Sequence, residues 1–241
     1  MSGHSRWAQI KRKKAVTDTK RGQMVTRLGK EISIASRLGG TDPEGNARLR
    51  LAIERARKSS MPNDNIKRAI AKGAGGEGAA AYEELTYEAY GPGGVAIIIE
   101  TATDNRNRTI AEVRHLLSKY GGNLGESGSV SWMFTKKGII VIAKNAADED
   151  KLLSIALDAG ADDLKTEDPD YFEIQTSPDQ FEKVLKAVTD AGIPVEEDKV
   201  GLIAENLVKV EATDAEKLSK LIEMIEENED VQNVYSNAEF V

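Results

Sequence analysis

The chain changes character once, at the segment GAGGEGAAA, residues 73–81. Before this segment, apolar residues such as Met24, Leu28 and Ile32 recur at helical spacing. After it, short apolar runs of strand length alternate with helical patterns. A stretch of small residues between two such patterns is typical of a flexible linker. The sequence therefore predicts separately folded parts on either side, and 241 residues have room for two or three small domains.

The ionised side chains divide at the same point. Residues 1–75 hold 18 Lys and Arg against 6 Asp and Glu, a net charge of +12. Residues 76–241 hold 15 against 34, a net charge of −19, and the two parts together give the −7 of the whole chain. Self-repulsion of this size in a small basic part is relieved by a polyanionic partner, of which nucleic acid is the commonest. The charge pattern therefore predicts nucleic-acid binding.

Residues 1–75 are predicted to form a basic arm followed by three helices. The arm has no usable apolar face. A cap at Thr17 or Asp18 begins the first helix, and the glycine pair at 39–40 ends it. The second helix begins at Asn46, and a short third helix follows the turn SSMPN.

The acidic part alternates predicted strands with predicted helices. Strands are predicted at 83–90, 94–102, 129–135, 138–144, 163–168, 171–176, 195–203, 206–211 and 231–237, and helices at about 107–120, 148–159, 178–191 and 214–228. Two of these helices carry sequences typical of capping boxes, Ser177-x-x-Gln180 and Thr213-x-x-Glu216.

The order of these elements indicates one domain nested in another. From 138 to 203 it is strand, helix, strand, strand, helix, strand, which is the ferredoxin-like or split βαβ pattern. The elements outside this block repeat that order, and hairpin tips tolerate insertions. The predicted fold class is multidomain α+β, in which a three-helix domain precedes two ferredoxin-like domains, one inserted in the other. The interrupted domain is predicted at 82–136 with 204–241, and the inserted one at 137–203.

Composition and motifs argue against several classes of function. Cysteine is absent and the two histidines, His4 and His115, lie far apart, so we predict no catalytic residues, no metal site and no cofactor. Gly73-x-Gly75-x-x-Gly78 matches a dinucleotide fingerprint by letter but follows a helix instead of a strand. Apolar runs fall short of the roughly 20 residues of a membrane span, and the amino terminus does not read as a secretory signal, so we expect a cytoplasmic protein.

The candidate nucleic-acid-binding residues begin in the arm and the start of the first helix. Mobile cations at this density can follow a phosphate backbone, and an aromatic ring can stack on a base. Trp7 has two interpretations, a stacking platform or an anchor packed against the core. The candidates in this region are His4, Arg6, Trp7, Lys11, Arg12, Lys13, Lys14, Lys20 and Arg21.

The first helix continues the basic surface with Lys20, Arg27, Lys30 and Arg37. Spacings of 7, 3 and 7 residues keep these cations within one stripe roughly 100° wide, away from the apolar face. The second helix adds Arg48, Arg50, Arg55, Arg57 and Lys58. An ordinary solvated helix face is the alternative for any single member.

The segment DNRNRT, residues 104–109, lies where a predicted strand ends and a helix begins. Free N–H groups at a helix amino terminus attract anions, and arginines add positive charge, so Asn105, Arg106 and Arg108 are candidates for a second phosphate contact. Asn105, Asn107 or Thr109 could each be the cap. The alternative is a capped turn whose arginines pair with the acidic part of the chain.

Several segments together resemble the YebC/PmpR family along the length of the chain: GHSRWAQIKRKKAVTDTKRG, SMPNDNIKRAI, YEAYGPGG, DNRNRTIAEVRH and GGNLGESGSV. The resemblance implies a three-helix domain followed by two α+β domains, one interrupting the other, in a cytoplasmic DNA-binding transcriptional regulator. Relatives are also tied to translation, as a mitochondrial translational activator and, in bacteria, at ribosomes stalled on proline-rich stretches. The chain departs from the family at Gln23, Val25 and Gly29, and a glycine inside the first helix is expected to weaken it by about 1 kcal/mol.

The function predicted is that of a non-enzymatic regulator that grips phosphates with its arm and first helix. DNA and ribosomal RNA are competing targets, and the SSMPN turn lacks the glycine typical of a helix-turn-helix, which favours RNA or the ribosome. Two alternatives belong to other classes: a nucleic-acid-modifying enzyme, and an adaptor whose basic domain binds an acidic protein. The sequence sets no oligomeric state, and a monomer is compatible with it.

Overall fold

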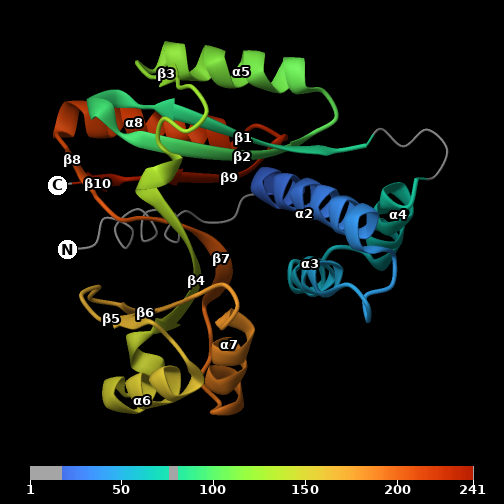
Figure 1. Ribbon diagram of the computed structural model, residues 1–241, viewed down its shortest axis with the longest axis vertical. Helices are drawn as coiled ribbons and strands as arrows, with labels where there is room; N and C mark the ends of the chain where they lie inside the picture. The colour runs from blue at the N-terminus through green and yellow to red at the C-terminus, as the bar shows by residue number, and fades with distance from the viewer. Residues whose placement is uncertain (1–17, 76–80, 241) are drawn as a thin grey trace. The chain divides into compact units, whose positions relative to one another are not determined.

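The computed structural model of the chain describes residues 18–75 and 81–240, with side chains from residue 22 onward (Figure 1). These residues fold into two compact units. One contains residues up to 130 together with 211–236, and the other contains 131–210 together with the described residues after 236. The chain is a multidomain α+β protein, as the sequence predicts. The domain boundaries predicted at 137 and 203 stay a prediction.

The first unit begins with three helices, α2 (Asp18–Gly39), α3 (Ala47–Lys58) and α4 (Asn63–Gly73). They enclose a core of buried apolar side chains that includes Ile32, Leu49, Ile53, Met61 and Ile66. This confirms the predicted three-helix bundle. Because the bundle fills its core with its own side chains, its many charged residues are left for the outside.

Asn46 joins the ends of two helices. Its Oδ1 accepts a hydrogen bond from the backbone N–H of Leu49 at 3.1 Å, which caps α3 as the sequence predicts. Its Nδ2 donates to the carbonyl oxygens of Ala35 and Gly40, both at 2.8 Å, so the same buried side chain also satisfies the end of α2.

Helices α2 and α4 approach closely where small residues face each other. A Cβ at Gly73 would lie 2.2 Å from the carbonyl oxygen of Ser33, so only glycine fits there. Ser33 Oγ donates to the carbonyl oxygen of Ala69 at 2.8 Å, and Ser36 Oγ donates to that of Ile70 at 3.0 Å. Gly29, by contrast, has only Met61 Cε nearby, 3.7 Å from its would-be Cβ.

Replacing Gly29 by Ala is therefore expected to stabilise the protein by about 1 kcal/mol, because alanine favours the helix and the added methyl makes an ordinary contact. Gly73→Ala is the matched control and is expected to destabilise the protein by about 1–3 kcal/mol through overpacking. Denaturant unfolding measures both changes. A destabilised Gly29→Ala variant would contradict the prediction.

The first unit continues with a sheet of four strands, β1 (Glu83–Tyr90), β2 (Ala96–Thr103), β3 (Asn123–Leu124) and β9 (Val231–Ser236), in the order β3-β1-β2-β9. All its pairs are antiparallel. The predicted GPGG turn joins β1 to β2. Helices α5 (Arg106–Lys119) and α8 (Ala212–Glu226) complete this part, and α5 contacts β3 and α8.

The second unit has the ferredoxin-like order that the sequence predicts. Its elements are β4 (Phe134–Ala143), α6 (Glu149–Ala159), β5 (Asp163–Lys165), β6 (Tyr171–Thr176), α7 (Phe181–Asp190) and β7 (Glu197–Ala204). The strands pair antiparallel in the order β5-β6-β4-β7. Buried side chains of the sheet and both helices, among them Ile140, Leu152, Phe172 and Val184, form its core.

Two expected strands of the outer domain differ from the structure. Residues 131–133 form a short 3-10 turn, and β8 (Val208–Val210) pairs in parallel with β10 (Ala238–Phe240) in a separate sheet. A ferredoxin-like outer domain would place the strand at 206–211 beside β2, but β1 lies there instead. The physical reason is proximity along the chain, because the tight turn brings β1 and β2 into register over eight residue pairs.

Both predicted capping boxes are also wrong. Helix α7 begins at Phe181, after the whole Ser177-x-x-Gln180 sequence, and Gln180 makes no side-chain capping bond. Helix α8 begins at Ala212, so Thr213 lies inside it.

Candidate nucleic-acid interface

The structure describes only part of the predicted set of contact residues. His4, Arg6, Trp7, Lys11, Arg12, Lys13 and Lys14 lie outside the described residues, and Lys20 and Arg21 lie in the first turn of α2 without described side chains. The members whose side chains are placed are Arg27, Lys30, Arg37, Asn105, Arg106 and Arg108. All six belong to the first unit.

In the stripe predicted on α2, the two middle members, Arg27 and Lys30, face the chain itself. Gln23 Nε2 donates to the carbonyl oxygen of Glu227 at 3.1 Å, and Arg27 Nη2 donates to that of Glu226. These carbonyls end helix α8, where the helix dipole attracts positive charge. Burial lowers the pKa of Arg27, against the opposing effect of the nearby Glu226 carboxylate. This part of α2 therefore anchors the helix to the end of α8.

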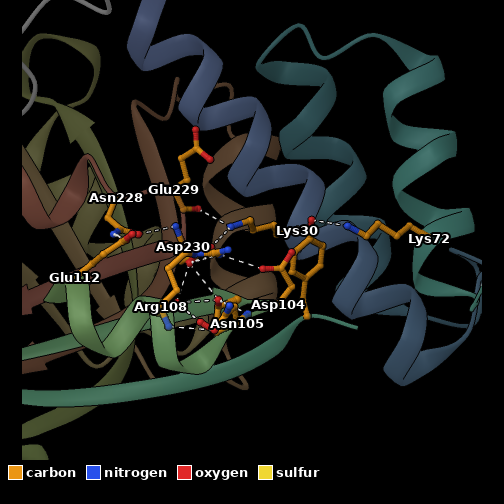
Figure 2. Close-up of polar contacts among 12 residues, drawn as sticks. Lys30, Lys72, Asp104, Asn105, Arg108, Glu112, Asn228, Glu229 and Asp230 are labelled. Atoms are coloured by element: carbon orange, nitrogen blue, oxygen red, sulfur yellow. Dashed lines mark hydrogen bonds and ion pairs between the residues drawn. The ribbon is translucent and has the colours of Figure 1, made fainter. Parts of the chain in front are cut away.

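Lys30 lies deepest in this face. Only 6% of the residue is exposed, and its Nζ donates to Asp230 Oδ1 at 2.6 Å and to the carbonyl oxygen of Glu229 at 2.8 Å (Figure 2). The expectation of an outward-facing Lys30 is therefore not met in this structure. An ammonium held this way serves the packing of α2 against the loop before β9.

Asp230, the partner of Lys30, is also buried, with 3% of the residue exposed. Its Oδ1 binds Lys30, while its Oδ2 accepts from Arg108 Nη2 at 2.7 Å, Thr109 Oγ1 at 2.8 Å and Thr103 Oγ1 at 3.1 Å. One carboxylate therefore connects α2, α5, the end of β2 and the loop before β9. We call this set the Asp230 junction: Lys30, Thr103, Arg108, Thr109 and Asp230.

The backbone and neighbouring side chains hold Asp230 in place. Its N–H donates to Asn228 Oδ1 at 2.8 Å, and Asn228 Nδ2 donates to Glu112 Oε2 at 2.6 Å, as Figure 2 shows. Burial acts to raise the pKa of Asp230, but the hydrogen bonds from Lys30, Arg108 and Thr109 outweigh it and lower the pKa to about 2. The group is ionised at neutral pH.

The amino terminus of α5 is capped by Asn105, whose Oδ1 accepts from the backbone N–H of Arg108 at 3.1 Å. This settles the choice among the three candidate caps. Arg108 also donates to Asp104 Oδ1 at 3.0 Å, and its hydrogen bond to Asp230 is the main cause of its raised pKa. Arg106 is exposed. Of the two arginines, Arg108 is thus engaged by carboxylates and Arg106 points to the surface.

Further contacts fasten the bundle to β1 and to the residue before it. Arg48 binds Glu31 of α2 through Nε at 2.8 Å and Glu84 of β1 through Nη2 at 2.6 Å. Lys72 Nζ donates to Tyr82 Oη at 2.7 Å, and Arg37 donates to the carbonyl oxygen of Tyr82. Arg37 is otherwise exposed.

Sequence reasoning missed two carboxylates that organise this unit, Asp230 and Glu88. Glu88 is 8% exposed, and it accepts hydrogen bonds from the backbone N–H groups of Gly128 and Val130, both at 2.7 Å. An acid placed within an apolar strand between Tyr87 and Ala89 was the available signal for it. For Asp230 the local sequence offers none, because its partners come from distant segments.

Over residues 18–75 and 81–240, no helix is both long enough and apolar enough to cross a bilayer. The same described residues contain no group of three or more His, Asp or Glu side chains placed to hold a metal ion.

By fold, this is a multidomain α+β protein whose basic helical bundle is anchored within its own unit by the buried ion pair between Lys30 and Asp230. Residues 5–76 match the family model described as the TACO1/YebC protein N-terminal domain, and residues 82–238 match the TACO1/YebC second and third domain. The chain belongs to the TACO1/YebC family, which confirms the resemblance seen in the sequence.

Similar proteins span nearly the whole chain. A probable transcriptional regulatory protein of Chloroherpeton thalassium is 57% identical over 99% of this chain and 96% of its own length. One from Desulforamulus reducens is 54% identical over 99% of both. The crystal structure of a conserved hypothetical protein from Aquifex aeolicus has a TM-score of 0.85 and 42% identity, and covers 95% of this chain and 94% of its own. The relatives' names support a regulatory role.

Proposed function

We propose that this protein is a non-enzymatic cytoplasmic regulator that acts by binding nucleic acid through residues 1–75. The observation that carries the proposal is the charge of this part, +12 against −19 for the rest of the chain. A polyanion is attracted to the first part and repelled by the second, so the charge distribution orients it as well as binds it.

The target is either DNA or RNA, and different observations favour each. The relatives named as probable transcriptional regulatory proteins favour DNA. The α3–α4 turn, which lacks a helix-turn-helix signature for reading bases, favours RNA, with ribosomal RNA as the leading target and relief of stalling on proline-rich stretches as the proposed outcome. Phosphate contacts are common to both.

The test is a salt series with the full chain and two probes, a short mixed-sequence DNA duplex and a fragment of ribosomal RNA. Fluorescence anisotropy measures the dissociation constants. With six to ten phosphate contacts, affinity is expected to fall by about 10³–10⁵ between about 50 and 200 mM salt. Binding that ignores salt, or no binding to either probe, overturns the proposal and leaves the adaptor or enzyme alternatives.

Co-sedimentation with ribosomes, compared with retention of promoter fragments at the same salt, separates the two targets.

Arg106→Ala is expected to reduce the salt slope by about 0.7–0.9, the value of one phosphate contact. We propose Arg106 as this second contact because it is exposed, whereas Arg108 is engaged by Asp230 and Asp104. An unchanged slope in Arg106→Ala removes the second contact from the proposal.

A further inference from the structure

Four exposed cations of the helical bundle flank the turn between α3 and α4. On α2, Arg27 and Lys30 are directed to the end of α8 and to Asp230. The four residues Arg57, Lys58, Lys67 and Arg68 are all exposed, and we call them the α3–α4 surface. We infer that the α3–α4 surface is where the bundle contacts the phosphate backbone of a nucleic acid. This inference rests on the proposed function. It assigns to the α3–α4 surface the phosphate contacts that the sequence predicts for Arg27 and Lys30.

The turn between the two helices is hydrogen-bonded and packed. Ser60 N–H donates to the carbonyl oxygen of Arg57 and Met61 N–H donates to that of Ala56, both at 2.9 Å. Ser60 has a φ of 57°, a left-handed conformation that is uncommon for a residue other than glycine. The Met61 side chain, 7% exposed, packs into the bundle core. These bonds tie the turn to the end of α3, and the N–H groups of Asn65 and Ile66 tie it to the start of α4 by donating to the carbonyl oxygen of Pro62.

The helical period explains why these cations face outward. Helix α3 packs inward with Leu49, Ala52, Ile53 and Ala56, and α4 with Ile66, Ala69 and Gly73. Positions 57, 58, 67 and 68 fall outside these buried stripes. Only four residues separate the two helices, so the cations of both lie within two helical turns of the same connection.

The segment that carries these cations is poor in carboxylates. Residues 54–68 hold five Lys and Arg against two acids, Glu54 and Asp64. Arg68 donates to Asn65 Oδ1 and to the backbone carbonyl oxygen of Asp64, and no ion pair to Arg57 or Lys67 occurs within the described chain. Positive charge therefore remains available here for a partner.

The chemistry favours a nucleic-acid backbone over an acidic protein surface. The cations are long, flexible side chains on either side of one turn, an arrangement that suits a regular line of phosphates without reading bases. They also belong to the same basic part as the rest of the +12 charge, so one extended polyanion can satisfy both. The contact is expected to be independent of base sequence.

The experiment compares two double variants of the full chain. Arg57→Ala with Lys67→Ala removes two cations of the surface, and Arg114→Ala with Lys119→Ala removes two exposed cations of α5 as a matched control. Anisotropy with the DNA duplex and the ribosomal RNA fragment is measured across the salt series. Circular dichroism and denaturant unfolding establish that both variants are folded.

For the surface variant, the salt slope is expected to fall by about 1.4–1.8 and the affinity near 0.1 M salt by about thirtyfold, with no such change in the control. If wild type binds with a steep salt slope and the surface variant does the same, this inference is wrong and the proposed function stands. A weaker affinity at an unchanged slope also overturns it, because phosphate contacts were then not lost. If wild type itself binds neither probe, the proposed function fails.

Discussion

Replacing Asp230 by Ala is expected to lower the free energy of unfolding by about 3–5 kcal/mol, the effect of leaving a buried charge without its partner. The ammonium of Lys30 would keep only the carbonyl oxygen of Glu229 as a hydrogen-bond acceptor, in a site where only 6% of the residue is exposed to water. Thr103 and Thr109 would also lose their shared acceptor. Denaturant unfolding of the variant and the wild type measures the change.

Two variants test whether the buried charge is the cause. Asp104→Asn removes the exposed partner of Arg108 and is expected to cost no more than about 1 kcal/mol. Adding Lys30→Met to Asp230→Ala is expected to recover part of the lost stability, because the unpaired ammonium is then gone. If the double variant is as unstable as the sum of the single ones, the coupling that we describe is absent.

Acid offers an independent test of the same carboxylate. Its pKa is about 2 in the folded protein, below the value of roughly 3.9 expected for an unfolded aspartate. A lowered folded-state pKa means that the stability it contributes is complete above the unfolded pKa and is lost as the pH falls towards 2. The stability gap between wild type and Asp230→Asn is therefore expected to narrow by about 2 kcal/mol between neutral pH and pH 2. A gap independent of pH would show that the ionised form of Asp230 does not matter.

Replacing Glu88 by Ala is expected to destabilise the protein by about 3 kcal/mol, because two backbone N–H groups lose a charged acceptor. The N–H of Val130 belongs to a residue that is wholly buried, so water cannot replace the carboxylate there without opening the loop. Hydrogen exchange is expected to show the largest loss of protection at residues 125–130.

Glu83→Ala is the matched control on the same strand, because Glu83 is exposed and its loss is expected to change stability by no more than about 0.5 kcal/mol. Glu88→Gln should lie between the two, since it keeps one carbonyl acceptor of the original pair. Uniform loss of protection over the whole unit in Glu88→Ala, without a focus on the loop, would mean that Glu88 supports the sheet instead of the loop.

Features set by local spacing were predictable from the sequence. The bundle of three helices follows from apolar residues at helical spacing and from Asn46, whose cap is where the sequence predicts it. The strand and helix order of 138–203 likewise predicts the observed ferredoxin-like sheet. Pairing of β8 with β10 was not predictable in this way, because α8 and β9 separate the two strands along the chain.

The candidate site separates along the same line. The spacing of Arg27, Lys30 and Arg37 predicts that they lie on one side of α2, but a spacing does not say what lies opposite that side. The loop before β9, some 200 residues away, lies there and brings Asp230 to Lys30. Arg27 and Lys30, which the sequence of one helix places on a solvent-facing side, instead attach the bundle to the end of α8 and to Asp230.

The sequence by itself determined the division of this protein into a basic helical part and an acidic α+β part, because charge and periodicity are local properties of the chain. The tertiary structure alone decided which cations are buried with carboxylates and which remain exposed on α3 and α4. The physical reason is that a buried ion pair forms only where two segments meet in space. Removing both charges from water is unfavourable, and this cost is offset only where the two groups are close enough and well enough oriented to form hydrogen bonds.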